Sequence, residues 1–350
     1  MPVTIEMPEI ASKALAKNAL GDPSTRRLPI LLPPGYESSD RRYPVIVGLT
    51  GFTGRGVMML NDSAWGPNLT QRLEALYAAG MPHAILILPD CFTRYGGSQY
   101  INSAATGRYE DYVIEELIPW VDAHYRTIPA PEARGVFGKS SGGYGSMILG
   151  MRHPDVFGAL ACHSGDMFFD LCYGRDFPAF CNAINRAGGV EEWWRRTVEK
   201  IGAVEKLAHE DMEALNILAM AACYSPDASA PLGIGLPMDL HTCERIPEVW
   251  VRWLEWDPIE LLDRHEQSLR GMRLLYMDCG NRDEFSLQFG ARLTAKRLTE
   301  RGIAFEYEEF DDGHMSVQYR YDVSLPKIAH ALAPAEKKPA VKTIARTKRG

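Results

Sequence analysis

One serine in this chain stands in a setting that suits nucleophilic chemistry. Residues 138–142 are Gly-Lys-Ser-Ser-Gly, which fits the pattern Gly-x-Ser-x-Gly. An apolar run ends at Phe137 and a helix-compatible run begins at Ser146, so the pattern predicts a sharp turn between a strand and a helix. Such a turn strains the residue at its tip, and the flanking glycines leave room for it. We therefore predict Ser140 as a nucleophile.

Two other interpretations fit the same residues. A five-residue pattern with three fixed positions arises often by chance in turns rich in glycine and serine. The tripeptide at 138–140 also matches the end of a phosphate-binding loop, but that motif requires a glycine where this chain has Ala133. The catalytic interpretation therefore depends on an acid and a base further along the chain.

A serine hydroxyl needs a base to take its proton, usually a histidine that a carboxylate orients. In one common arrangement the serine, the acid and the histidine follow in that order, each in a loop after a strand. His314 is the histidine that lies just beyond a late predicted strand, at 305–308. We predict His314 as the base, and we expect structural or exposed roles for the other histidines.

The acid is to be found among three carboxylates that follow the predicted strand at 274–277. Asp283 lies a few residues past this strand, where a loop can turn it toward His314. Asp278 stands at the end of the strand, and Glu284 is adjacent to Asp283. We favour Asp283 and keep the other two as alternatives.

The negative charge that forms on an attacked carbonyl oxygen needs two backbone N–H donors. We predict one at Ser141, directly after the nucleophile and at the start of the helix. The second should come from a loop after an earlier strand, and Thr50-Gly51-Phe52 follows the predicted strand at 44–49. Phe52 is the predicted donor, with a plain glycine-rich turn as the alternative.

Short apolar runs alternate with helical patterns along most of the chain. The predicted strands are 28–32, 44–49, 84–88, 135–137, 160–162, 274–277 and 305–308, and the predicted helices are 69–79, 109–125, 258–269, 287–301 and 323–332. The helix at 258 begins well, with Asp257 as its cap and proline at its first position. The middle strands are apolar on both faces. We predict an α/β fold with a doubly wound, mostly parallel sheet, helices on both faces, and a site at the carboxyl ends of the strands.

One connection is far longer than an ordinary loop of a handful of residues. It joins the strands at 160–162 and 274–277, and we interpret residues 170–256 as a cap inserted into a domain of residues 1–333. Five of the seven tryptophans lie in this cap, where they either form its own core or line a substrate pocket. Residues 334–350 are basic and poor in residues that could pack, so we expect a disordered tail.

Composition narrows the class of protein. A chain of 350 residues can bury a large core, and 46% hydrophobic with 24% charged residues is ordinary for a globular protein. The formal net charge of −7 argues against a general nucleic-acid binder. We expect a small-molecule ester as partner and neither nucleic acid nor membrane, because no apolar stretch is long enough to span a bilayer. The sequence leaves a homo-oligomer open.

The seven cysteines are scattered and odd in number, without a CxxC pair or a zinc-like Cys/His spacing. We therefore expect reduced thiols and neither a metal nor a cofactor. Residues 1–20 lack the apolar core of a secretory signal. Together these features predict a cytoplasmic protein.

Taken together, the chain resembles the putative-esterase family of α/β-hydrolases, which includes S-formylglutathione hydrolases, feruloyl and acetylxylan esterases, enterochelin-type esterases and mycolyltransferases. The resemblance runs from about residue 27 to 332 outside most of the cap. It rests on the segments 31–36, 43–45, 138–145, 279–285 and 313–314. It implies an α/β-hydrolase fold with Ser140 as nucleophile, Asp283 as acid and His314 as base.

Two positions depart from the family pattern. Thr50 stands where members usually have a histidine before the glycine, so the hydrogen bonds that support this loop must differ. Lys139 precedes the nucleophile where histidine or glutamate is often found, and we expect its positive charge near the entrance. The long cap also prevents transfer of a substrate by analogy.

The leading hypothesis is a serine carboxylesterase that forms an acyl-enzyme intermediate. An acyltransferase with the same triad is an alternative, because an aromatic cap that excludes water would favour an acceptor alcohol. A non-catalytic binding protein on a hydrolase scaffold is a third hypothesis, and the ordered triad argues against it.

Overall fold

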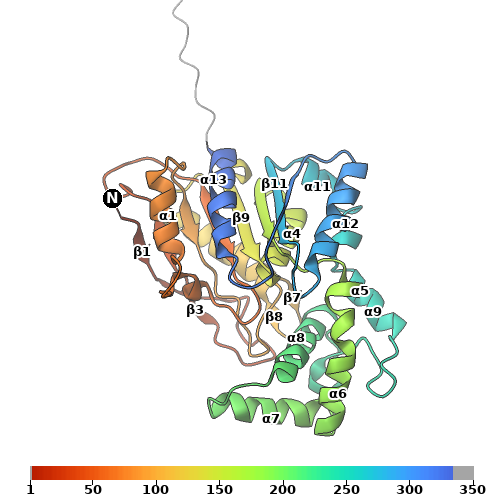
Figure 1. The fold of residues 1–350 in the computed structure, drawn as a ribbon. Helices are drawn as coiled ribbons and strands as arrows, with labels where there is room; N and C mark the ends of the chain where they lie inside the picture. The colour runs from red at the N-terminus through yellow and green to blue at the C-terminus, as the bar shows by residue number, and fades with distance from the viewer. Residues whose placement is uncertain (1, 334–350) are drawn as a thin grey trace, which may run out of the picture.

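The computed structural model describes residues 2–333, which form a central sheet between layers of helices (Figure 1). The strand order is β1-β4-β6-β5-β9-β10-β11-β12. Pairs from β6 through β12 are parallel, whereas β4 pairs antiparallel with β1 and β6. The bounds are β1 (Thr4–Glu6), β4 (Ile30–Leu32), β5 (Val45–Leu49), β6 (Ile85–Ile87), β9 (Arg134–Lys139), β10 (Ala159–His163), β11 (Leu274–Gly280) and β12 (Glu306–Phe310). The predicted α/β, mostly parallel fold is confirmed.

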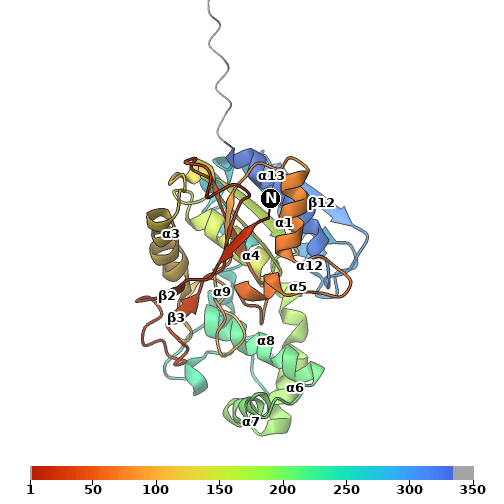
Figure 2. The ribbon, with the colours of Figure 1, turned by 90° about the vertical axis from the view of Figure 1, so that its left-hand side faces the viewer.

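Helices cover both faces of the sheet, and its middle strands are therefore buried on both sides. One face packs against α1 (Leu69–Ala78) and α13 (Tyr321–Leu332). The other face packs against α4 (Ser141–Arg152) and its neighbours α3 (Ile118–His124) and α12 (Leu287–Glu300). Figure 2 shows α3 and α1 on opposite sides of the molecule. Two short ribbons, β2 (Glu9–Ala11) with β3 (Thr25–Arg27) and β7 (Asn102–Ser103) with β8 (Gly107–Arg108), lie outside the main sheet.

Two predicted helices are interrupted. The segment predicted at 109–125 is divided into α2 (Tyr109–Asp111), a π-helical stretch (Tyr112–Leu117) and α3. The segment predicted at 258–269 is divided into α10 (Pro258–Leu261) and α11 (Glu266–Arg270). Periodicity alone does not show such breaks, because the pieces on either side of each break keep their apolar side chains on the core side.

Asp257 caps α10 as predicted and also fixes a second helix. Its Oδ1 accepts a hydrogen bond from the amide of Ile259 at 3.0 Å. The same carboxylate accepts from the amides of Phe168 and Phe169 at 3.1 and 2.7 Å, where α5 (Phe169–Cys172) begins. One buried side chain therefore ties the start of the long connection to its end.

The connection between β10 and β11 is mainly helical. It contains α6 (Phe177–Ala187), α7 (Val190–Gly202), α8 (His209–Tyr224) and α9 (Pro247–Leu254), and α6, α7 and α8 lie together at one end of the sheet (Figures 1 and 2). Trp193, Trp250 and Trp253 are buried there, which gives these helices an aromatic core. The boundaries 170–256 and 1–333 stay predictions, and the predicted tail at 334–350 lies outside the described residues. Among the helices of residues 2–333, none is both long and apolar enough to cross a membrane.

Candidate active site

Ser140 lies at the tip of a tight turn between β9 and α4, with φ of 60° and ψ of −126°. A side chain at either flanking glycine would collide with backbone. An added Cβ at Gly138 would lie 2.3 Å from the carbonyl oxygen of Gly142, and one at Gly142 would lie 2.3 Å from that of Leu49. The amide of Ser140 donates to the carbonyl of His163 at 2.9 Å. The turn therefore needs both glycines, as the sequence pattern predicts.

His314 follows β12 and is buried together with Asp283. The Nδ1–H group of His314 donates to Asp283 Oδ2 at 2.7 Å. Asp283 Oδ1 accepts from the amide of Phe285 at 2.9 Å, which orients the carboxylate. Because Nδ1 carries the proton, Nε2 of the imidazole is left as the basic nitrogen.

The two alternative acids have other partners. Glu284 Oε2 accepts from the backbone amide of His314 at 2.6 Å and so holds the loop rather than the ring. Asp278 Oδ1 accepts from Nδ1 of His163 at 2.7 Å. Of the three carboxylates considered, Asp283 is the one whose side chain contacts the His314 ring.

Asp278 belongs to a second Ser-His-Asp set, which the sequence did not reveal. Nε2 of His163 is hydrogen-bonded to Ser324 Oγ at 2.8 Å, and Asp278 Oδ2 accepts from Arg320 and Tyr276 at 2.8 and 2.9 Å. Ser324, His163 and Asp278 are all buried. Burial opposes ionisation of Asp278, yet its bonds to His163 and Arg320 lower its pKa. This set lies in the packing between the sheet and α13.

His314 is also contacted by Lys139, which directly precedes Ser140, and by Phe285. Lys139 Nζ donates to the backbone carbonyl of His314 at 2.8 Å, and the Phe285 ring packs against the imidazole with centroids 4.8 Å apart. Burial lowers the pKa of Lys139. The positive charge that we expected near the entrance is thus bound to the backbone of the predicted base.

Within the described residues, no hydrogen bond joins Ser140 Oγ to His314. Such bonds are often long in the absence of substrate and tighten when it binds. Phe285, whose ring packs against the imidazole of His314, also lines the cavity that contains Ser140.

The loop that carries the predicted oxyanion donor runs close to the serine. An added Cβ at Gly51 would lie 3.3 Å from Ser140 Cβ, so glycine permits this approach. In the part of the chain that the structure describes, the Phe52 amide has no hydrogen-bond acceptor. Ser141 is the first residue of α4, where amides lack acceptors within the helix. Tyr100 Oη donates to the backbone carbonyl of Thr50 at 2.6 Å. This bond supports the loop at Thr50, the position where the family pattern has a histidine.

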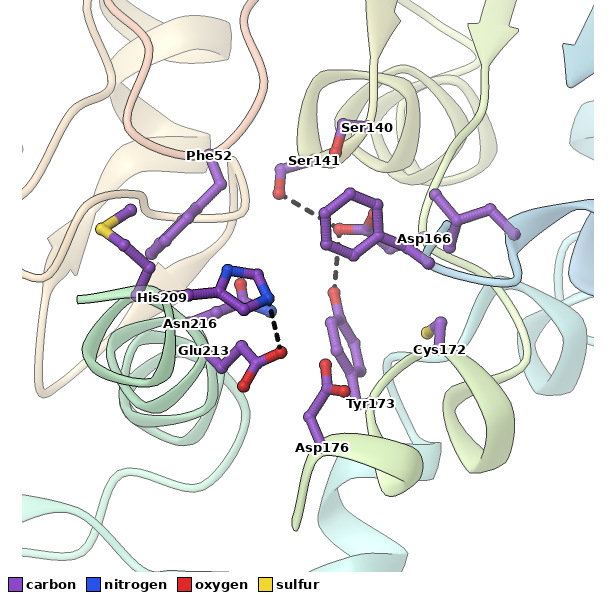
Figure 3. A pocket seen from close by; sticks show the side chains of 13 residues that line it. Phe52, Ser140, Ser141, Asp166, Cys172, Tyr173, Asp176, His209, Glu213 and Asn216 are labelled. Carbon is purple, nitrogen blue, oxygen red and sulfur yellow. Dashed lines mark hydrogen bonds and ion pairs between the residues drawn. The ribbon is translucent and has the colours of Figure 1, made fainter. Parts of the chain in front are cut away.

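A cavity of about 190 Å³ opens beside Ser140 (Figure 3). Its wall comes from the turn itself, the Phe52 loop, the start of the long connection, α8 and the segment before α12. The lining residues are Phe52, Ser140, Ser141, Asp166, Cys172, Tyr173, Asp176, His209, Met212, Glu213, Asn216, Phe285 and Leu287. None of the five tryptophans at 193, 194, 250, 253 and 256 is among them, so the aromatic wall comes from other rings.

Asp166 is a functional candidate that the sequence did not single out. It lies three residues after β10 and is 6% exposed. Its Oδ2 accepts from Ser141 Oγ at 3.1 Å, from Tyr173 Oη at 2.9 Å and from Gln99 Nε2 at 3.1 Å. Burial raises the pKa of Asp166 against these bonds. No motif marks such a residue, because its donors come from three separate segments.

The family model described as "Putative esterase" matches residues 23–331. Esterase Rv1288 of Mycobacterium tuberculosis is 30% identical over 137 residues, which is 39% of this chain and 28% of that protein. An uncharacterized protein, YbbA of Bacillus subtilis, is 26% identical over 156 residues, 41% of this chain and 58% of that one. The matches thus span less than two thirds of these relatives.

Solved structures share the fold at low identity. A ferulic acid esterase superposes with a TM-score of 0.60 at 18% identity, covering 94% of this chain and 99% of that one. FphF, a fluorophosphonate-binding serine hydrolase of Staphylococcus aureus, gives 0.58 at 14% identity and covers 95% and 100%. An S-formylglutathione hydrolase from Agrobacterium tumefaciens gives 0.58 at 14% identity and covers 95% and 96%. The chain therefore has the α/β-hydrolase fold and belongs to the putative esterase family, as its motifs predicted.

Proposed function

We propose that this protein is a serine carboxylesterase that cleaves its substrate through an acyl-enzyme intermediate. The observation that carries the proposal is the 2.7 Å bond between His314 and Asp283, next to Phe285, whose ring packs against His314 and lines the cavity that contains the strained Ser140. A histidine so oriented is suited to take a proton from the serine hydroxyl. The membership of the chain in an esterase family supports the same reaction.

In the proposed first half-reaction, Ser140 Oγ attacks the ester carbonyl while His314 Nε2 takes the hydroxyl proton. The amides of Phe52 and Ser141 donate to the oxyanion of the tetrahedral intermediate. The bond to the alcohol oxygen then breaks, and His314 gives the proton to the leaving alcohol. Asp283 keeps the Nδ1–H tautomer in place throughout.

In the second half-reaction, a water molecule attacks the acyl-serine. His314 takes a proton from this water and returns it to Ser140 as the carboxylic acid leaves. One ester and one water are consumed, and one acid and one alcohol are formed. The reaction needs no cofactor, and we propose a small-molecule ester as the partner of the site.

The test compares Ser140 with Ser324, a buried serine that is hydrogen-bonded to a different histidine, His163. Ser140→Ala should lower kcat/KM for 4-nitrophenyl butyrate by about 10³-fold or more, because the nucleophile is removed. Ser324→Ala is the matched control, since its hydroxyl bonds His163 away from the cavity, and folded Ser324→Ala protein should keep its turnover. A fluorophosphonate probe should label the wild type and not the Ser140 variant. If folded Ser140→Ala protein turned over the ester as fast as the wild type, the proposal would be contradicted.

A further inference from the structure

We propose that the cavity beside Ser140 accepts an ester with a positively charged arm, an ammonium or guanidinium group that binds between Asp176 and Glu213. This inference rests on the proposed function, because it specifies the substrate class of that serine site. It concerns one arm of the ester, on either the acyl or the alcohol side of the bond that Ser140 attacks.

The cavity has a reacting end and an acidic end. Ser140 and Ser141 lie at one end, and Asp176 and Glu213 lie at the other (Figure 3). Asp176 ends a short 3-10 turn before α6, and Glu213 lies on α8. An apolar cavity of about 150 Å³ holds a benzene molecule, so the 190 Å³ here is enough for an arm of similar size. A group carried on such an arm can reach the acidic end while the ester stays beside the serine.

Among residues 2–333, three carboxylates line this cavity, and no lysine or arginine does. Asp166 is nearest the serine turn, because its Oδ2 accepts from Ser141. Its Oδ1 has no hydrogen-bond partner among the described residues, although the side chain is more than nine-tenths buried. His209 is the one basic residue that the described part of the chain contributes to the lining. The interior is therefore formally anionic.

The carboxylates at the acidic end are incompletely neutralised. Asp176 Oδ1 lies 3.5 Å from Arg175 Nε, but Nη1 of that arginine donates to the Glu284 carbonyl and to Ser286 Oγ at 2.8 and 2.7 Å. Glu213 Oε1 lies 3.1 Å from His209 Nε2, and the His209 side chain is 89% exposed. An incoming cation can displace so exposed a ring.

The surroundings of Asp176 also favour a cationic ligand. Burial raises its pKa to about 6, and Glu213 acts in the same direction, against Arg175 and His209. A carboxylate that is costly to ionise gains most from a ligand that brings the opposite charge. The rings of Phe52 and Phe285 line the same cavity, and aromatic faces attract cations. Sugar hydroxyls also bind carboxylates, but they would leave the negative charge uncompensated.

Two pairs of substrates, each matched in shape, test the charge. On the acyl side, the 4-nitrophenyl ester of 4-guanidinobutyrate is compared with that of 4-ureidobutyrate. On the alcohol side, acetylcholine is compared with 3,3-dimethylbutyl acetate, and an acetylated methyl glucoside serves as the neutral polyol. Each kcat/KM is divided by the rate constant for hydrolysis of the same ester by hydroxide, which corrects for differences in intrinsic reactivity. A charge-assisted contact predicts a cation preference of roughly tenfold or more in at least one pair, decreasing as salt is added.

Variants locate the source of the preference. Asp176→Asn and Glu213→Gln should each reduce the ratio of cationic to neutral kcat/KM by about threefold to tenfold, and thermal unfolding confirms that both fold. Glu210→Gln is the matched control, because Glu210 lies on the same helix, pairs with Arg186 and is 55% exposed. It should leave the ratio unchanged.

The outcomes separate the two proposals. If the wild type cleaves charged and neutral esters equally, or prefers the polyol, while cleavage still depends on Ser140, the cation site is refuted and the esterase proposal stands. If Ser140→Ala retains full turnover, the esterase proposal itself fails. A cation preference that survives in both Asp176→Asn and Glu213→Gln would also overturn the inference.

Discussion

The two aspartates that hold histidines in this protein should respond differently to the same substitution. Asp283 and Asp278 each accept from a histidine Nδ1 at 2.7 Å, and both are buried. Asp283→Asn should lower kcat by about 10³- to 10⁴-fold, because an amide disturbs the tautomer of the base. Asp278→Asn should act on stability instead, since its histidine bonds Ser324, away from the cavity that contains Ser140.

The size of the stability loss follows from the contacts of Asp278. Its carboxylate is bonded to His163, Arg320 and Tyr276. Removing one member of a buried, hydrogen-bonded charge pair costs about 3–5 kcal/mol, against a total of about 5–15 kcal/mol for an ordinary domain. For a chain of 350 residues, unfolding entropy is about 0.7 kcal/mol per kelvin. Asp278→Asn should therefore lower Tm by about 4–7 °C.

Differential scanning calorimetry and initial rates with 4-nitrophenyl butyrate provide the measurements. The pKa of Asp278 is lowered in the fold by His163 and Arg320 against burial, so its stabilisation is present above its ordinary pKa of 3.8 and is lost as pH falls further. The Tm gap between wild type and Asp278→Asn should narrow in acid. A large loss of kcat in folded Asp278→Asn, or none in Asp283→Asn, would refute the assignment of the acid.

Two further predictions concern charged residues near the site. Lys139→Gln removes the ammonium that donates to the His314 carbonyl at 2.8 Å, and it should lower kcat about threefold to tenfold with little change in KM. The control is Lys296→Gln, at a lysine whose side chain is 70% exposed, which should change neither constant. Equal kcat values for wild type and Lys139→Gln in steady-state assays would contradict this positioning role. Because the pKa of Asp176 is raised to about 6 by burial and Glu213, its stability contribution is fully present below its ordinary pKa of 3.8 and declines as pH rises to about 6. In urea unfolding, the free energy of unfolding of Asp176→Asn should therefore rise relative to that of the wild type between pH 4 and 6, and the difference should stay constant above pH 6. A difference in unfolding free energy that does not depend on pH would exclude the raised pKa.

Local geometry explains why the turn at Ser140 could be predicted from the sequence alone. A strand, a strained residue and a helix must follow one another within a few residues. Gly138 and Gly142 are needed because any side chain there would collide with backbone atoms close by. The later strands were likewise predicted from the sequence, at 274–277 and 305–308, and the loops that follow them carry Asp283 and His314. The family, confirmed by its match over residues 23–331, was evident from these segments together.

Tertiary structure decided what depends on partners far apart in the chain. The register pairs His163 on β10 with Asp278 on β11, and α13 brings Ser324 to the same histidine, whereas Asp283 in the loop turns toward His314. No periodicity reports which carboxylate faces which ring. The acidic end of the cavity has the same origin, because Asp176 and Glu213 become neighbours only when α8 packs beside the start of α6. The sequence alone was enough to predict the family and to single out Ser140, because both depend on short local segments, whereas long-range packing set which carboxylates line the cavity.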